Sequence, residues 1–298
     1  MIYVSGPISF DTMIYCPEFP EPNTAVPITE LHESCGGAAG NVASCLSALG
    51  VRASVISLAG KDFPGSGYES RLKSLGVSLE HVKVEARELT SHAFMPVNSH
   101  GEIQSFFFQG ATKNFDSLPV PKIRLGKKDL LHIATGSPGF NRRLSASFPK
   151  EKISFDPGYD IPLYSKSDLE YIFSRVGIIS MNENELKASL EKTGKSAPEG
   201  LLDYGATALV VTFGKRGSKI FSGGKSLHVR AYDKAAPIDT TGAGDAYKAG
   251  FAAAYSRGME IGECAKVGSA TASFIIEHIG GQAGIPDWET ALSRSKKL

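Results

Sequence analysis

A glycine-rich segment near the end of the chain, residues 239–245, has the residue types needed to transfer a phosphoryl group. It lies where an extended polar stretch gives way to a helical pattern of small residues. Gly242 and Gly244 have no Cβ, so the backbone can turn sharply there and expose consecutive amide groups. Unpaired amides at a helix N-terminus, together with the helix dipole, form an anion site suited to a phosphoryl group.

A carboxylate, Asp245, follows these glycines in the first turn of the expected helix. Because like charges repel, a carboxylate beside a bound anion suggests a chemical role. Asp245 could accept the proton of an attacking hydroxyl while the amides stabilise the phosphoryl oxygens. The alternative is that Asp245 only complements the helix dipole, as any first-turn aspartate does. The segment alone leaves both interpretations open.

Short apolar runs alternate with helical patterns along the chain, which is typical of βαβ units. Several of the helical patterns end at a glycine, a common helix terminator. We therefore expect an α/β fold, with a mostly parallel sheet and helices on both of its faces. The expected strands include residues 2–4, 53–58, 153–155, 178–179 and 208–212.

Two regions break this alternation, roughly residues 10–33 and 91–108. Their pattern is that of exposed antiparallel strands, so we expect them to form a small β-lid. No linker, low-complexity stretch or repeat divides the sequence. We expect a single domain over residues 1–298 that carries these lid segments.

The composition argues against several classes of protein. The 298 residues carry a formal net charge of +1, so no basic field indicates nucleic-acid binding. The four cysteines form no C-x-x-C pair and have no histidines at zinc spacing, which suits reduced thiols in the cytoplasm. No apolar run approaches the roughly 20 residues of a membrane span. We expect a cytoplasmic protein without nucleic-acid or membrane partners.

Taken together, the chain resembles the ribokinase-like family of carbohydrate and nucleoside kinases, also called the phosphofructokinase-B family, over essentially its whole length. Residues 36–43 are similar to the first signature of that family and residues 239–245 to the second. The resemblance implies that Asp245 is the base. It also implies that the anion hole consists of Gly242, Ala243 and Gly244.

On the acceptor side, the resemblance implies that Gly37 and Asn41 contact hydroxyl groups of the substrate, joined by Asp11. A carboxylate and an amide can hold adjacent sugar hydroxyls because one accepts hydrogen bonds and the other also donates them. For Asp11 considered alone, a turn of the lid is an equally good interpretation.

On the nucleotide side, Asn182 and Glu185 resemble an Asn-x-x-Glu motif near Mg²⁺ and the phosphates. Glu185 would act through metal-bound water, because Mg²⁺ keeps several waters. The alternative is a capping pair at the following helix. Residues 212–217 resemble a turn that approaches ATP through Thr212, Gly214 and Gly217, although a simple hairpin turn is also compatible with the spacing.

In many relatives, a monovalent cation such as K⁺ lies near residues that match Asp239, Thr241 and the loop around Gly284. The ligands would be mainly carbonyl oxygens, which the sequence does not specify. The implied cofactors are therefore ATP and Mg²⁺, with K⁺ as a further option.

Residues 19–24, 132–141 and 154–166 are similar to the archaeal nucleoside kinases of this family. We therefore expect an ATP-dependent kinase that transfers the γ-phosphoryl group to a ribose-containing acceptor, at the 5′-hydroxyl of nucleosides. The alternative is a sugar kinase of the ribokinase, fructokinase or phosphofructokinase type. For a phosphorylated sugar, Lys113 or Arg142 could supply a basic group. A non-catalytic nucleotide-binding protein is a third reading.

Aromatic residues of the lid could cover a nucleoside base, because stacking tolerates different bases. The candidates are Phe10, Tyr15, Phe106 and Phe108. The outer face of a small sheet needs cover or polarity, and relatives often pair two lids. We therefore expect a homodimer formed through the lid.

Overall fold

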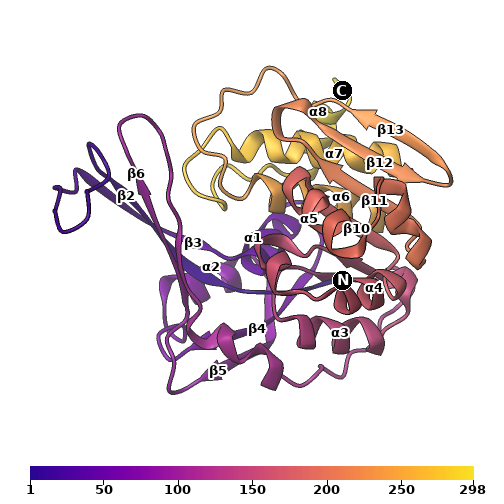
Figure 1. Cartoon of the computed structure of the whole chain (residues 1–298), viewed down its shortest axis with the longest axis horizontal. Coiled ribbons are helices and arrows are strands. Elements are labelled where there is room, and N and C mark those ends of the chain that lie inside the picture. The colour runs from indigo at the N-terminus through magenta and orange to yellow at the C-terminus, as the bar shows by residue number, and fades with distance from the viewer.

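The computed structural model describes all 298 residues and shows a large sheet flanked by helices, with a smaller sheet projecting from it (Figure 1). All neighbouring strands of the large sheet are parallel except for the last two pairs at one edge, which are antiparallel. This confirms the predicted fold class. In spatial order the strands are β13 (Lys225–Val229), β12 (Ser218–Ser222), β11 (Ala208–Thr212), β10 (Ile178–Asn182), β9 (Ile153–Phe155), β8 (Leu130–Ile133), β1 (Ile2–Ser5), β4 (Ala53–Gly60) and β5 (Ser78–Glu85).

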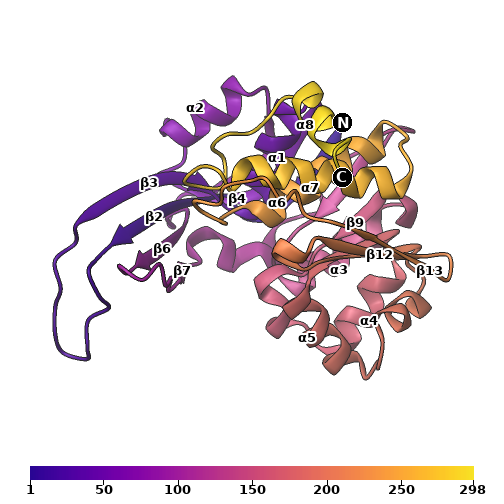
Figure 2. The same ribbon diagram turned by 90° about the horizontal axis from the view of Figure 1, so that it is seen from above.

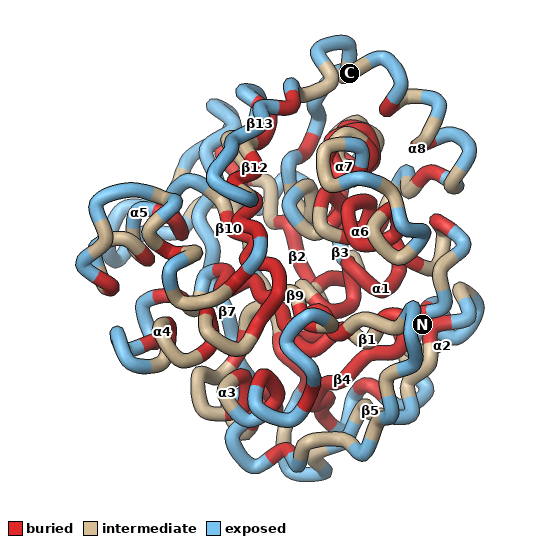
Figure 3. Tube along the Cα trace, turned by 90° about the vertical axis from the view of Figure 1, so that its right-hand side faces the viewer, coloured by how far each residue is buried: buried red, intermediate tan, exposed pale blue.

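Helices cover both faces of this sheet (Figure 2). One face carries α1 (Ala38–Ala48), α2 (Gly67–Ser74), α6 (Ala243–Ser256), α7 (Ile261–Ile275) and α8 (Trp288–Ser295). The other carries α3 (Pro138–Ser147), α4 (Lys166–Ser174) and α5 (Glu183–Thr193). Strand β4 is buried along its whole length, as expected for a parallel strand covered on both sides. Figure 3 shows the buried residues gathered in the sheet and in the inner turns of α1, α6 and α7.

The smaller sheet is the lid, with strand order β3 (Glu30–Gly36), β2 (Ser9–Tyr15), β6 (Ser91–Val97) and β7 (Phe106–Phe108). Its strands fall within or close to the two expected lid segments. The pairs β2–β3 and β6–β7 are antiparallel, but β2 and β6 run parallel, so the expectation of a purely antiparallel lid is wrong. The reason is topological: β2 continues from β1 and β6 from β5, and these two strands point the same way in the large sheet.

The carboxyl ends of the parallel strands bring distant residues together. Asn182 ends β10 and Thr212 ends β11, and the two are direct neighbours across the strands. Asp156 follows the last residue of β9, the next strand along. Ligands bind at this edge in open α/β sheets, because the connecting loops and helix N-termini gather there.

None of the helices combines the length and the apolar composition that a membrane-spanning segment requires.

Candidate active site

The start of α6 offers free amide groups at the segment singled out from the sequence. Gly242 precedes the helix with φ of 74°, and a Cβ at this position would lie 2.5 Å from the Cα of Gly281. Only glycine fits this close, left-handed turn. The amide of Ala243 donates to the carbonyl of Thr240 at 3.2 Å, whereas the amides of Gly244 and Asp245 have no acceptor within the helix. The N-terminus therefore has the donors that an anion needs.

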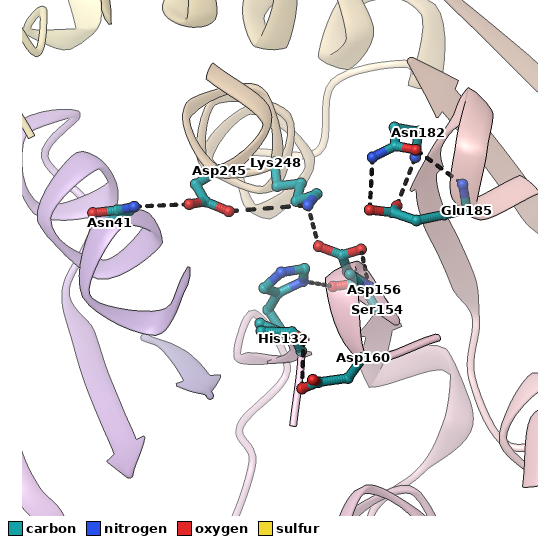
Figure 4. A network of polar contacts seen from close by, with 12 residues as sticks. Asn41, His132, Ser154, Asp156, Asp160, Asn182, Glu185, Asp245 and Lys248 are labelled. Atoms are coloured by element: carbon teal, nitrogen blue, oxygen red, sulfur yellow. Dashed lines mark hydrogen bonds and ion pairs between the residues drawn. The ribbon is translucent and has the colours of Figure 1, made fainter. Parts of the chain in front are cut away.

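Asp245 lies in this first turn and faces α1 (Figure 4). Its Oδ2 accepts a hydrogen bond from Nδ2 of Asn41 at 2.8 Å, and its Oδ1 lies 4.0 Å from Nζ of Lys248. Burial raises the pKa of Asp245, while the charge of Lys248 and the hydrogen bond from Asn41 lower it. The fold thus brings together two of the predicted site residues, Asn41 and Asp245.

Lys248 and Asp156 form a buried ion pair beside Asp245 (Figure 4). Burial opposes the charge of Lys248, but the carboxylates of Asp156, Asp245 and Glu185 outweigh burial and raise the pKa of Lys248. Sequence reasoning did not select either residue. A signal for Lys248 was present, because a residue three positions after Asp245 lies on the same side of a helix. Asp156 could have been found as the polar residue that closes a buried strand.

Glu185 lies in the first turn of α5 and forms a capping box with Asn182. The amide of Glu185 donates to Oδ1 of Asn182 at 2.9 Å, and the amide of Asn182 donates to Oε2 of Glu185 at 2.7 Å. The capping interpretation is therefore confirmed as local geometry. Burial and the charge of Asp156 raise the pKa of Glu185 to about 7, while Lys248 lowers it. Three carboxylates, those of Asp156, Glu185 and Asp245, thus share one lysine.

The turn between β11 and β12 borders a surface hollow lined by Asn182, Glu183, Asn184, Thr212, Phe213 and Gly214. Gly214 has φ of 55°, and a Cβ there would meet no atom within 4 Å. At Gly217 a Cβ would lie 2.1 Å from the carbonyl oxygen of Val229, so packing against β13 explains that glycine. The turn does join antiparallel strands, as the hairpin alternative proposed, and it also opens onto the hollow.

Asp11 is a buried residue of β2 at the base of the lid rather than part of a turn. Ser9 Oγ donates to its Oδ1 at 2.6 Å, and a Cβ on Gly36 would overlap its carboxylate. Burial raises the pKa of Asp11 to about 6; the bond from Ser9 opposes this, and the charge of Asp245 adds to it. At the start of α1, a Cβ on Gly37 would lie 2.5 Å from the carbonyl oxygen of Pro7, so glycine is required by the close passage of the chain.

Asp239 and Thr241 belong to the loop that leads into α6. Oδ1 of Asp239 accepts from the amide of Thr241 at 2.9 Å, and its Oδ2 accepts from the amide of Gly280 at 2.8 Å. Asp239 therefore ties the loop before α6 to the loop after α7. This connection fixes the close contact between Gly242 and Gly281.

One further buried residue, Gln282, contacts the site and carries no sequence motif that could have revealed it. Its Nε2 donates to Oδ1 of Asn41 at 3.1 Å and to the hydroxyl of Tyr68 at 2.9 Å. Residues 41 and 282 meet only because the loop after α7 returns to α1, which a local pattern does not reveal.

The two faces of the lid differ in their side chains, because residues alternate along a strand and direct cross-strand partners share a face. The face that carries Asp11 also holds Met13, Tyr15, Ala93, Met95 and Phe107. The opposite face holds Phe10, His92, Phe94, Phe106 and Phe108. Of the four aromatic residues expected over a base, only Tyr15 shares the face of Asp11. The other three candidates, Phe10, Phe106 and Phe108, lie on the opposite face.

Comparison with known proteins finds a matching family model, a related sequence and two solved structures of similar fold. Residues 2–288 match the family described as pfkB family carbohydrate kinase. The chain is 39% identical over 291 residues to a nucleoside kinase of Methanothermobacter thermautotrophicus, with 97% of this chain and 93% of that protein covered. The chain is also similar to the crystal structure of Methanocaldococcus jannaschii nucleoside kinase, an archaeal member of the ribokinase family. The TM-score is 0.94 at 34% identity, and the match covers 100% of this chain and 98% of that chain. A Burkholderia thailandensis nucleoside kinase in complex with inosine shares the fold, with a TM-score of 0.88, 23% identity, and 100% and 96% coverage.

Proposed function

The chain belongs to the pfkB family of carbohydrate kinases, and on this basis we propose that it transfers the γ-phosphoryl group of ATP to the 5′-hydroxyl of nucleosides. It is a phosphotransferase with an alcohol group as acceptor. The observation that carries the proposal is the position of Asp245 in the same helical turn as the free amides of α6, with its carboxylate oriented by Asn41.

In this proposal Asp245 accepts the proton of the acceptor hydroxyl as the hydroxyl oxygen attacks the γ-phosphorus of ATP, and the bond from that phosphorus to the bridging oxygen breaks to release ADP. Gly242, Ala243 and Gly244 form the anion hole of this proposal: the amide of Gly244 is free to donate to a phosphoryl oxygen, whereas that of Ala243 would share its proton with the carbonyl of Thr240. The charge of Lys248 opposes the effect of burial on the pKa of Asp245 and so favours the ionised form, which can accept that proton. Asp11 and Asn41 hold the ribose hydroxyls, joined by the backbone of Gly37.

The nucleotide would lie along the carboxyl ends of β10 and β11, over the hollow that Asn182, Thr212 and Gly214 border. Gly217 supports this turn from behind by its contact with β13. The open space at Gly214 lets a ligand approach the main chain closely, which a side chain would prevent.

The site also fits Mg²⁺. The carboxylates of Asp156, Glu185 and Asp245 exceed the single charge of Lys248, and hard oxygen donors suit this ion. No group of three acidic, histidine or cysteine side chains converges as direct ligands, which favours contact of Glu185 through metal-bound water. When bound, Mg²⁺ neutralises charge on the phosphates of ATP. A K⁺ ion near Asp239 and Thr241 would use backbone carbonyls, because the Asp239 carboxylate is bonded to two amides.

Three observations favour nucleosides over phosphorylated sugars. The relative at 39% identity and the solved structure at 34% identity are nucleoside kinases. The basic residues considered for a sugar phosphate have other partners: Lys113 pairs with Glu88 at 2.8 Å, and Arg142 pairs with Asp168 at 3.2 Å. On the acceptor side of the lid, Met13, Tyr15, Met95 and Phe107 provide an apolar cover for a base.

The opposite face of the lid fits a second copy of the chain. Phe94, Phe106 and Phe108 expose 38%, 58% and 47% of their surface there, and Leu31 on β3 exposes 50%. Exposed apolar faces of this kind mark association sites. We therefore propose a homodimer through the lids, in which each protomer is one domain with its lid attached. With all four cysteines free, the protein suits the reducing cytoplasm.

The proposed function is tested by measuring kcat/KM for inosine, adenosine and cytidine against ribose, fructose and fructose 6-phosphate, under identical ATP and Mg²⁺. The nucleosides should be preferred, because a free sugar forgoes the contact of the base with the lid and loses turnover as well as affinity. A sugar that equals the best nucleoside would replace the nucleoside assignment with the sugar kinase alternative. Absence of ATP consumption with every acceptor would support the non-catalytic reading.

A further inference from the structure

A chain of buried hydrogen bonds leads to Asp245 from the opposite side to Lys248. Gln282 lies at its centre, and its Nε2 contacts both Asn41 and Tyr68. Its Oε1 accepts from the hydroxyl of Ser44 at 3.0 Å and from Nε of Arg71 at 3.4 Å. Asn41 then donates to Asp245.

The groups at the two ends of this series of hydrogen bonds leave only one orientation for the side-chain amides between them. At one end, the carbonyl of Gly36 can only accept, so the single hydroxyl proton of Tyr68 is used in the 2.6 Å bond between them. The Tyr68 oxygen must then accept from Gln282. At the other end, the guanidinium of Arg71 can only donate, so it must face Oε1 of Gln282. Both ends require the NH₂ group of Gln282 to point toward Tyr68 and Asn41.

This orientation determines which end of Asn41 faces the base. Because the NH₂ of Gln282 donates to Oδ1 of Asn41, the NH₂ of Asn41 is left to face Asp245. The reversed amide would place an oxygen against the carboxylate, which repels its ionised form. An asparagine without such a neighbour could adopt either orientation.

We infer that Gln282 is a positioning residue, which holds Asn41 in the one orientation that stabilises the ionised form of Asp245. The inference rests on the proposed role of Asp245 as the base. Gln282 touches neither the acceptor nor ATP in this account, and it acts through Asn41. Its loss should therefore change the pH at which Asp245 becomes active.

Other charges around Asp245 do not depend on Gln282. The titratable groups that face the Asp245 carboxylate belong to Lys248, Asp156, Glu185, Asp11, Tyr159 and Cys45. None of these six side chains is hydrogen-bonded to Gln282, whose side-chain partners are Asn41, Ser44, Tyr68 and Arg71. A neutral substitution of Gln282 should consequently reach Asp245 through Asn41 alone.

The test is the pH dependence of kcat for inosine in the unmutated enzyme, Gln282→Met, Asn41→Ala and the double variant. Methionine keeps the length of the side chain, adds no charge and removes the donor to Asn41. The acid limb is the low-pH part of the profile, where kcat rises as Asp245 ionises. We expect the acid limb of Gln282→Met to move upward by about half to one pH unit. Its kcat should fall by up to about tenfold at pH values below the limb and change little above it. A general packing defect would lower kcat at every pH.

The double variant separates positioning from any other effect. If Gln282 acts through Asn41, its substitution adds no further shift in the Asn41→Ala background. Gln282→Asn, whose shorter amide cannot reach Asn41, gives the same test with less change of polarity. The exposed Gln109, changed to Met, is the matched control and should leave the acid limb in place.

The inference is overturned if the acid limb of folded Gln282→Met or Gln282→Asn stays where it is in the unmutated enzyme. It is also overturned if the shifts of Gln282→Met and Asn41→Ala add in the double variant. Failure of the proposed function gives a different result, because the unmutated enzyme would then not prefer inosine to a free sugar. Failure of the role proposed for Asp245 would be seen as turnover retained in Asp245→Asn. If Asp245→Asn is inactive and the limb does not move, only the inference about Gln282 is wrong.

Discussion

Nδ2 of Asn41 lies 2.8 Å from Oδ2 of Asp245, although the two residues are 204 positions apart in the sequence. The bond joins α1, which follows the lid strand β3, to α6, which begins at the free amides. It therefore connects the acceptor side of the site to the residue proposed to accept the proton.

Glu185→Gln should raise the Mg²⁺ concentration needed for half-maximal turnover while leaving the KM of the acceptor nearly unchanged. Glutamine keeps an oxygen for the bond from the amide of Asn182, so the capping box and α5 are largely preserved. The change removes the charge proposed to act on the water shell of the ion, and such outer partners typically contribute tenfold to a hundredfold in metal affinity. Titration of turnover with Mg²⁺ measures the effect. An unchanged Mg²⁺ requirement would return Glu185 to a capping role alone.

Lys248→Met should lower stability and turnover together. It leaves the Asp156 carboxylate buried without its counter-charge, and breaking a buried pair in this way costs about 3–5 kcal/mol. The double variant Lys248→Met with Asp156→Leu removes both charges and should recover most of the stability. Turnover should not recover, because Asp245 still lacks the positive charge that favours its ionised form. Chemical denaturation and kcat of the two variants and the unmutated protein are the measurements. Full activity in the stable double variant would contradict the role given to Lys248.

Asp11→Asn should stabilise the protein at pH 8 while weakening acceptor binding. Because the pKa of Asp11 is about 6 in the folded protein, above its ordinary value of 3.8, ionisation opposes folding. The stability that the neutral carboxyl contributes is complete below pH 4 and is lost as pH rises through about 6, to a total of roughly 2–3 kcal/mol. Thermal unfolding at pH 5 and pH 8 should therefore show a smaller pH dependence for Asp11→Asn than for the unmutated protein. An equal dependence in both proteins would place the pKa of Asp11 near its ordinary value.

Phe106→Asp should convert the proposed dimer into a monomer without unfolding it. The ring is 58% exposed on the lid face opposite to Asp11, so a carboxylate there costs little in the monomer but is buried in the dimer. Phe107→Asp is the matched control, since Phe107 neighbours it on the other face of the same strand. Sedimentation velocity at micromolar concentration distinguishes the species. If the unmutated protein is already a monomer, the lid does not form a dimer interface.

The sequence predicted the parts of the site that depend on local backbone geometry. The amides of α6 and the capping pair of Asn182 and Glu185 follow from residues within one turn of each other, so their spacing is informative. Strand register in the lid was not predicted, because a shift of one residue exchanges the two faces and aromatic composition alone does not fix it. That is why Phe107, rather than Phe106 or Phe108, shares the face of Asp11.

The sequence also did not reveal which residues far apart in the chain contact one another in the site. The pairing of Lys248 with Asp156 requires that α6 crosses the end of β9, and the contact of Gln282 with Asn41 requires that the last loop returns to α1. Neither contact has a periodicity or a motif in the chain. The structure explains the contact of Gln282 with Asn41, because the Cα of the neighbouring Gly281 packs against Gly242. The sequence alone does not indicate this packing.

The central claim, that Asp245 is the base of phosphoryl transfer, is tested most directly by kcat of Asp245→Asn with inosine, ATP and Mg²⁺. Asparagine keeps the size of the side chain and an oxygen for the bond from Asn41, so the fold should be retained, and its thermal unfolding provides the check. Because the proton acceptor is lost, we expect kcat to fall by about 10²–10⁴-fold. Turnover within tenfold of the unmutated enzyme in a folded Asp245→Asn protein would contradict the account.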